Sequence, residues 1–192
     1  MIWFTSDPHL GHDKDFVWQA RGFKSIDEMN AEIIRRWNER VSPDDDVYVL
    51  GDLTLGDIEA GIAFIATFNG KLHIMRGNHD TDKKVERYLE LPNVIEVKYA
   101  DVLKYGKAVF WMGHYPTITA NYDDDKPWAK HVVCLFGHTH QEQPFYNDNP
   151  YMFNVGMDAH NCTPISIEEI IETIRNKKQE LNNEKIKENI NV

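Results

Sequence analysis

The chain has 192 residues, of which 42% are hydrophobic and 27% are charged, a balance typical of one globular domain rather than of a disordered or fibrous chain. Its 21 lysine and arginine residues are outnumbered by 31 aspartate and glutamate residues, which gives a formal net charge of −10. This charge argues against long-range attraction to nucleic acid or to an anionic membrane.

The first half of the chain alternates short apolar runs with amphipathic segments. A capping pattern, Ser25-Ile-Asp-Glu28, opens a segment in which apolar residues recur at helical intervals up to about Arg40. Alternation of strands and helices indicates a parallel sheet joined by right-handed crossovers. In chain order, we expect strands at 2–5, 47–50 and 72–75, and helices at 25–40, 57–67 and 83–90.

The second half has a different pattern, in which short apolar runs are separated by turn signals such as Tyr105-Gly106. The last residues, 182–192, are rich in Asn, Lys and Glu, and we expect them to fray. In chain order, we expect antiparallel strands or hairpins at 94–97, 101–105 and 108–112, further strands at 132–136 and 152–155, and a helix from Ile165 to about Leu181.

Length and composition also bound the domain organisation and the compartment. We expect a single domain over residues 1–181, followed by a polar C-terminal tail over 182–192. No apolar run approaches the roughly 20 residues of a membrane span, and the N-terminal residues lack the basic region of an export signal. Cys134 and Cys162 are too few for a disulfide framework. A cytoplasmic protein with no membrane partner is therefore expected, and its oligomeric state stays open.

Five apolar runs are each followed by a loop that carries Asp, Asn or His, and a glycine enters the last four of these loops. In open α/β sheets, ligands bind beyond the carboxyl ends of the strands, so such loops can converge on one place. Each short motif is weak evidence by itself, but together they form a coherent set. The motifs are Asp7-Pro8-His9, Gly51-Asp52, Gly77-Asn78-His79-Asp80, Gly113-His114 and Gly137-His138-Thr139-His140.

The side chains of these loops offer imidazole, carboxylate and amide donors and no thiolate. This set suits first-row divalent ions better than Mg or Ca, which prefer oxygen donors only. We expect two divalent metal ions, with manganese as the first candidate and iron, zinc, nickel or cobalt as alternatives. Two ions that share a carboxylate would lie roughly 3.5–4 Å apart and would make hydroxide available at neutral pH.

In this order, the motifs DPH, GD, GNHD, GH and GHTH resemble the motif set of the calcineurin-like metallophosphoesterase superfamily, over about residues 5–140. The resemblance implies a four-layer α/β/β/α sandwich of two mixed sheets flanked by helices. It also implies that Asp52 bridges two ions and that His79 protonates the leaving oxygen or steadies the transition state, with Asp80 orienting its ring. The implied ligands are Asp7, His9, Asp52 and His140 for one ion, and Asp52, Asn78, His114 and His138 for the other.

The resemblance further implies a metal-dependent phosphoesterase that hydrolyses a phosphomonoester or a phosphodiester, with a nucleotide as one candidate. Metal-bridging hydroxide would attack phosphorus in line. The expected partner is a small phosphate-ester substrate. Two alternatives stay open: a catalytically silent protein of this fold that binds or scaffolds other molecules, and a nuclease of the same superfamily, which the charge of −10 disfavours.

Several residues near the motifs carry no assigned role. Arg76 could contact substrate phosphate or form a structural ion pair. The stretch 115–130 is the expected substrate-facing loop, because its aromatic residues, which include Tyr122 and Trp128, could stack on a base or cover the site. Arg21 has the same two alternatives as Arg76, and His12 could line the pocket or lie in solvent. A supporting role or a place at the substrate rim stays open for Asn154, Asp158 and His160.

Overall fold

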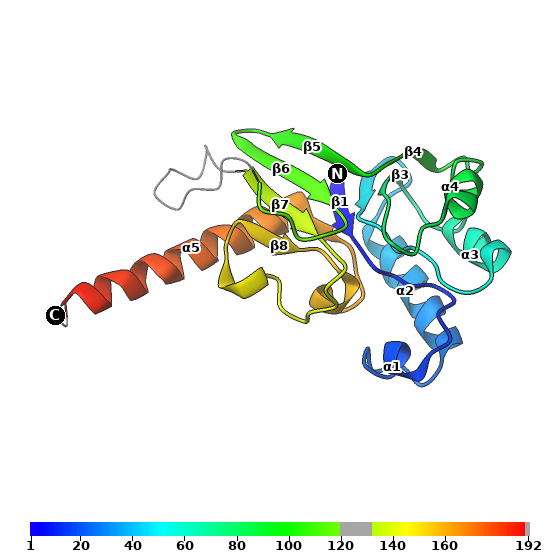
Figure 1. Ribbon diagram of the computed structural model, residues 1–192, viewed down its shortest axis with the longest axis horizontal. Helices are drawn as coiled ribbons and strands as arrows, with labels where there is room; N and C mark the ends of the chain where they lie inside the picture. The colour runs from blue at the N-terminus through cyan, green and yellow to red at the C-terminus, as the bar shows by residue number, and fades with distance from the viewer. Residues whose placement is uncertain (120–131, 191–192) are drawn as a thin grey trace.

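Two β-sheets packed against one another form the centre of the protein, with helices around them (Figure 1). The structure, a computed structural model, describes residues 1–119 and 132–190, and it gives only the backbone of 188–190. Both sheets contribute loops to one end of the sandwich, so the fold decides which polar side chains can meet.

The first sheet contains the following strands: β1 (Ile2–Thr5), β2 (Asp46–Val49), β3 (Lys71–Met75), β4 (Val94–Lys98) and β9 (Ile165–Ser166). Their order across the sheet is β4-β3-β2-β1-β9. The first four strands are parallel, and β9 pairs antiparallel with β1. Because parallel strands end at the same edge, the loops after β1, β2 and β3 emerge side by side.

The second sheet contains β5 (Ala100–Tyr105), β6 (Ala108–Gly113), β7 (Val132–Phe136) and β8 (Met152–Asn154), in that order across the sheet. β5 and β6 form the predicted antiparallel hairpin, whereas β6, β7 and β8 are parallel. Only Tyr99 separates β4 from β5, so the chain passes there directly from one sheet to the other.

Helices cover the outer face of the first sheet and bury a core against it. Ser25 caps one of them by accepting a hydrogen bond from the backbone N–H of Glu28, as the capping pattern predicted. In this core the rings of Trp37 and Phe68 stack with centroids 4.0 Å apart. The helices are α1 (Asp15–Trp18), α2 (Ile26–Arg40), α3 (Ile58–Ile65) and α4 (Asp82–Tyr88).

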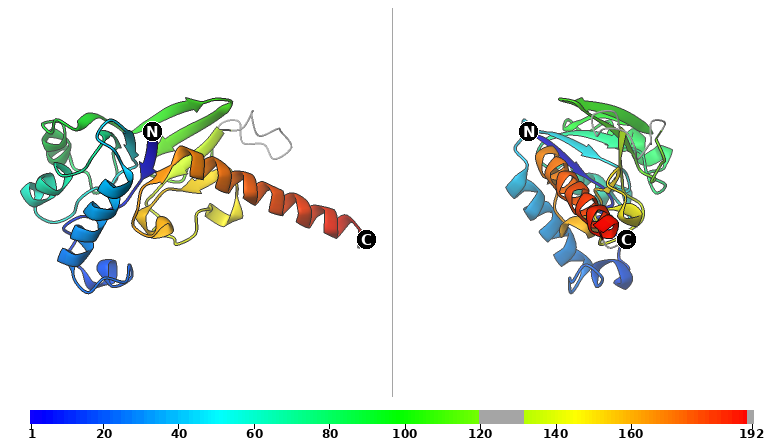
Figure 2. Two further views of the ribbon diagram at one scale, coloured as in Figure 1. Left: turned by 180° about the vertical axis from the view of Figure 1, so that it is seen from behind. Right: turned by 90° about the vertical axis from the view of Figure 1, so that its left-hand side faces the viewer.

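A second core fills the space between the two sheets. Phe4 from the first sheet meets Phe110 and Leu135 from the second, and all three side chains are fully buried. Helix α5 (Ile167–Ile190) closes this core with Ile170, while its later turns extend away from the body of the protein (Figure 2). The inward faces of both sheets are thus buried against one another, and this packing fixes the position of one sheet relative to the other.

The outer face of the second sheet carries a small third cluster around Cys134, Phe136 and Met152. Tyr146, in the short 3-10 helix η2 (Tyr146–Asp148), packs on it with its ring centroid 6.0 Å from that of Phe136. Another 3-10 helix, η3 (Met157–His160), follows β8. Among the described residues, η2 therefore covers part of this face.

Three expectations for the second half of the chain were wrong. β4 pairs parallel with β3, because α4 acts as a crossover helix and returns the chain to the first sheet. Residues 165 and 166 form β9 rather than the start of a helix. Helix α5 continues to Ile190, beyond the expected end near Leu181, because Glu and Lys residues favour helix even where no apolar periodicity marks it.

The predicted fold class, two mixed sheets flanked by helices, is confirmed. Each sheet is mixed because β9 runs against β1 and β5 runs against β6. Within the described part of the chain, no helix combines the length and the apolar character needed to cross a membrane.

Candidate metal centre

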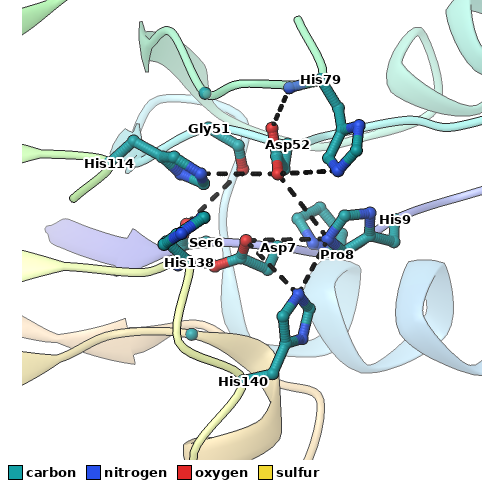
Figure 3. A network of polar contacts seen from close by, with 12 residues as sticks. Ser6, Asp7, Pro8, His9, Gly51, Asp52, His79, His114, His138 and His140 are labelled. Carbon is teal, nitrogen blue, oxygen red and sulfur yellow. Dashed lines mark hydrogen bonds and ion pairs between the residues drawn. The ribbon is translucent and has the colours of Figure 1, made fainter. Parts of the chain in front are cut away.

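The loops after β1, β2, β3, β6 and β7 meet at one end of the sandwich, where their polar side chains face one another (Figure 3). Asp7, His9, Asp52 and His114 are each exposed to no more than 3%. Burying so many carboxylates and imidazoles together is costly unless charge is compensated. The loops are therefore arranged for a charged ligand.

Two glycines allow the loops to approach this closely. A Cβ added at Gly137 would lie 2.0 Å from Ser6 Oγ and 2.3 Å from Asp7 Oδ2. Gly51 has φ 96°, and a Cβ there would lie 2.7 Å from His114 Nδ1. Any larger residue at either position would push the polar side chains apart.

Backbone strain gathers at the same place. Nine non-glycine residues in the described chain have a positive φ, and five of them are predicted metal ligands. Such conformations cost about 1–3 kcal/mol each and persist where the surrounding structure enforces them, often at functional sites. The five are Asp7 (φ 58°), His9 (φ 50°), Asp52 (φ 54°), His138 (φ 65°) and His140 (φ 50°).

Asp7, His9 and His140 form what we call the first donor group, with ligand atoms that all lie within 4.8 Å of one another. His9 Nε2 lies 3.2 Å from His140 Nε2 and 3.7 Å from Asp7 Oδ1. Two nitrogens bound tetrahedrally to one ion at about 2.0–2.1 Å are about 3.3 Å apart. The spacing of the two imidazoles therefore fits a shared metal ion.

Asp52, Asn78 and His114 form the second donor group. His114 Nε2 lies 3.4 Å from Asp52 Oδ2 and 2.9 Å from Asn78 Oδ1. Asp52 Oδ2 also lies 3.9 Å from His9 Nε2, so one carboxylate oxygen faces both groups. Asp7 has a ligand atom within 4.8 Å of those of Asp52 and His114 as well. How the ligands divide between two ions stays a prediction.

His138 lies against the second donor group. Its ring centroid is 5.0 Å from that of His114, and its backbone N–H donates to Asp7 Oδ2 at 2.8 Å. Burial and the neighbouring His114 lower the pKa of His138. Both causes favour the neutral imidazole, which is the form that binds a metal ion.

The chemistry of the donor atoms fits divalent cations. Among the described residues, the buried Asp7 Oδ1 and His9 Nδ1 have no hydrogen-bond partner. An unpaired buried carboxylate oxygen is unfavourable unless a positive charge compensates it. Carboxylate, imidazole and amide donors without thiolate suit a first-row divalent ion. The residues present therefore fit two such ions.

Asp158, at the start of η3, supports the first donor group from behind. Its Oδ2 accepts a hydrogen bond from His140 Nδ1 at 2.8 Å, and Arg21 Nε donates to its Oδ1 at 2.8 Å. Burial alone would raise the pKa of Asp158, but these two partners outweigh it and hold the pKa far below the usual range. The bond to His140 leaves Nε2 of that ring directed at the donor group.

Asp80 supports the main chain of the second donor group. Its Oδ2 accepts from the backbone N–H groups of Asp52 and Gly77 at 2.8 and 2.9 Å, and its Oδ1 accepts from the Tyr88 hydroxyl at 3.0 Å. The predicted contact between Asp80 and the ring of His79 is absent from the described contacts. Asp80 is 1% exposed and lies beneath the loop, facing backbone amides instead.

Sequence reasoning missed two further supports, Lys84 and Tyr88 of α4. Lys84 Nζ is buried and donates to the backbone oxygens of His79 at 2.9 Å and Thr54 at 2.6 Å. Burial lowers the pKa of Lys84. The available signal was the spacing of four residues between Lys84 and Tyr88, which places both on the side of α4 that meets the loop carrying His79 and Asp80.

His79 lies at the mouth of the centre, outside both donor groups. Its side chain is 46% exposed, and its Nε2 is 4.0 Å from Asp52 Oδ2. Its backbone N–H donates to Asp52 Oδ1 at 2.8 Å. The imidazole is thus near the donor atoms yet reachable from solvent.

The structure also shows where two other histidines, His12 and His160, lie. His12 approaches the first donor group, with its ring centroid 5.6 Å from that of His9, and burial lowers its pKa. His160 is instead held by structural contacts, because its Nε2 bonds the backbone oxygen of Asn154 at 2.7 Å and its ring stacks on Phe153.

Of the residues proposed to face substrate, Arg76 forms an ion pair with Asp82 at 2.6 Å and donates from Nε to the backbone oxygen of Asp80 at 2.5 Å. Those contacts agree with a structural role for its charge. Tyr122 and Trp128 of the expected substrate-facing loop lie outside the described residues.

A model of the calcineurin-like phosphoesterase superfamily domain matches residues 1–168. The chain belongs to this superfamily. The resemblance carried by the five motifs is thereby confirmed, and the paired Asp and His groups at the strand ends agree with a family that uses divalent metals.

The chain is also similar to other proteins. The chain is 31% identical over 185 residues to the uncharacterized protein MJ1445 of Methanocaldococcus jannaschii, covering 92% of this chain and 93% of that one. It is 27% identical over 188 residues to the Gene 66 protein of Mycobacterium phage D29, covering 85% and 92%. The solved structure of the protein of unknown function AQ665 from Aquifex aeolicus shares the fold, with TM-score 0.68, 20% identity, and coverage of 90% and 98%.

Proposed function

We propose that this protein is a metal-dependent hydrolase acting on a small phosphomonoester or phosphodiester. The observation that carries the proposal is the position of Asp52 Oδ2, which lies 3.9 Å from His9 Nε2 and 3.4 Å from His114 Nε2. One carboxylate oxygen thus faces two sets of donors, as a bridge between two ions requires. Manganese is the first candidate ion because the donors mix imidazole with oxygen.

The polar side chains of the centre have two proposed roles, because some would bind the ions and others would position those ligands. Two divalent ions, when bound, would supply positive charge for the phosphate oxygens and make water a nucleophile at neutral pH. Asp158 would position the ligand His140, and Asp80 would position the backbone of the ligand Asp52. The proposed ligands are Asp7, His9, Asp52, Asn78, His114, His138 and His140.

His79 is the side chain that we assign to the leaving oxygen. It is half exposed at the mouth of the centre, where an imidazole can give a proton to a departing alkoxide. Its main chain is fixed on both sides, because its N–H donates to Asp52 Oδ1 and its carbonyl accepts from Lys84 Nζ. The ring is therefore held near the reacting atoms without being a ligand.

The substrate that we infer is a small ester rather than a long nucleic acid. A protein that holds a nucleic-acid backbone needs a basic surface, and this chain has a formal net charge of −10. Positive charge would be concentrated at the metal centre, so one phosphate group is the feature that the site can recognise best.

Hydrolysis of p-nitrophenyl phosphate and bis-p-nitrophenyl phosphate by the full chain tests the proposal. We expect turnover of at least one ester with added Mn²⁺, loss of turnover after chelation, and recovery when Mn²⁺ is returned. No turnover of either ester by protein that holds two ions would favour the silent binding or scaffold protein. Cleavage of DNA or RNA with steep salt dependence would favour the nuclease.

A further inference from the structure

A hollow of about 410 Å³ opens beside the second donor group. We call it the side hollow. Its volume lies within the range of roughly 300–1,000 Å³ that is usual for small-molecule sites. Its walls come from the loop after β3, the junction of β4 with β5, and the loop after β6, and they include Arg76, Gly77, Asn78, Asp82, Tyr99 and Tyr115.

Tyr99 forms one wall of the side hollow. It is 74% exposed although it is a large aromatic residue. Its hydroxyl accepts a hydrogen bond from Arg76 Nη1 at 3.0 Å, and Arg76 Cζ lies 5.5 Å from its ring centroid. Arg76 is itself held by Asp82 and by the backbone oxygen of Asp80. The Tyr99 ring is thus positioned by a fixed cation.

Tyr115 forms another wall and follows directly after the donor His114. It is 50% exposed. Its ring meets those of His114 and His138 at centroid distances of 5.0 and 4.7 Å, in edge-to-face geometry. One side of the ring therefore touches the metal centre while the residue also lines the hollow.

Neither tyrosine belongs to the hydrophobic cores of the described chain. Exposed rings beside a guanidinium are a platform on which planar aromatic groups stack. The charge of Arg76 is matched by Asp82, so the side hollow favours an uncharged ring over a second phosphate. Asn78 lines the hollow and is also a donor, so a ligand can reach both places at once.

We propose that the side hollow binds a planar aromatic group carried by the substrate, such as a nucleobase, while the phosphate lies at the donor groups. This inference rests on the proposed function, because the aromatic group enters the hollow as part of a phosphate ester. It identifies the preferred substrate class as esters of nucleosides or of other aromatic alcohols.

The test compares two ligands that differ only in the base. Adenosine 5′-monophosphate and ribose 5-phosphate are used as inhibitors of bis-p-nitrophenyl phosphate hydrolysis by the Mn²⁺-loaded chain. We expect the adenosine ester to inhibit at about tenfold lower concentration, because stacking of one base has about that effect. In Tyr99→Ala this preference should disappear, whereas Tyr99→Phe should keep it because the ring remains.

Tyr105→Ala is the matched control, since Tyr105 is an exposed tyrosine at the far end of β5 and bonds Glu168. It should leave the preference unchanged. Equal inhibition by the two ligands in the wild-type chain, or equal weakening of both in Tyr99→Ala, would overturn the inference. Absence of any hydrolysis would instead count against the proposed function, and calorimetric binding of the same two ligands would then decide the side hollow separately.

Discussion

The two donor groups of the metal centre are held in place by different means. The first contains His140, whose side chain is 45% exposed and is steadied by Asp158 and Arg21. The second contains His114, whose side chain is 1% exposed and whose Nδ1 bonds the backbone oxygen of Leu50 at 2.8 Å. The first donor group therefore depends on a pair of charged side chains, and the second on buried main chain.

This difference teaches which half is easier to disturb. Backbone groups at strand ends cannot be removed by substitution, so the second donor group is protected against most single changes. The first depends on one carboxylate and one guanidinium. We therefore expect an ion at the first group to exchange faster and to be removed first by a chelator.

The largest effect on turnover should come from a substitution that disturbs both donor groups together. Asp52→Asn keeps the size of the side chain but removes the charge that faces both groups. If the ions no longer stabilise the transition state by several kcal/mol, kcat should fall by about 10³-fold or more. Metal content measured by mass spectrometry should also fall below two ions. Asp46→Asn, at the other end of β2, should change neither quantity, and an Asp52→Asn chain with two ions and full turnover would refute the bridging role.

The second-largest effect should leave both donor groups intact. His79→Ala should lower kcat by about 10²–10⁴-fold, the usual contribution of a positioned proton donor, while both ions stay bound. Steady-state kinetics and metal analysis of the same preparation check this. His73→Ala, on the strand that leads into the same loop, is the control. Turnover unchanged in His79→Ala would remove His79 from the mechanism.

A third substitution should affect one donor group and not the other. Asp158→Asn weakens the support of His140 and leaves Arg21 without its charged partner, so affinity for one ion should fall about 10–100-fold. The other ion should be unaffected, and competition with a graded chelator should show two well-separated steps. Asp148→Asn, which breaks an exposed ion pair with Lys177, is the control. Equal weakening of both ions would contradict the contrast between the groups.

The smallest effect should come from the support of the second group. Tyr88→Phe leaves the buried Asp80 Oδ1 without its hydroxyl donor, so the free energy of unfolding should fall by about 1–2 kcal/mol. Both ions should remain bound, because Asp80 Oδ2 still accepts from Asp52 and Gly77. Urea unfolding of the metal-loaded chain measures the change. Tyr105→Phe, at the surface, should give little change, and loss of an ion in Tyr88→Phe would show that this half is no sturdier than the other.

Much of the fold could be predicted, because strand–helix alternation in the first half is a local signal. The direction of β4 could not, since a strand-like run as short as residues 94–97 gives no indication of which neighbour it pairs with. The end of α5 was missed for another reason. A polar helix has no apolar periodicity to mark it, although Glu and Lys favour helix.

That these polar side chains meet was predictable, because the loops that carry them each follow an apolar run. Their supports were harder to find, since Asp158 lies more than 100 residues from Arg21 and only the fold brings the two together. The resemblance implied that Asp80 orients the ring of His79. The described contacts of the Asp80 carboxylate are instead with backbone amides, which only the folded loop brings to it.

Counting the ions is the most direct test of a centre in which one carboxylate serves two donor groups. The full chain is loaded with Mn²⁺, freed of excess metal, and weighed intact under native conditions. The arrangement around Asp52 predicts a mass increase equal to two ions per chain. A chain that saturates with a single ion, or with none, would contradict it.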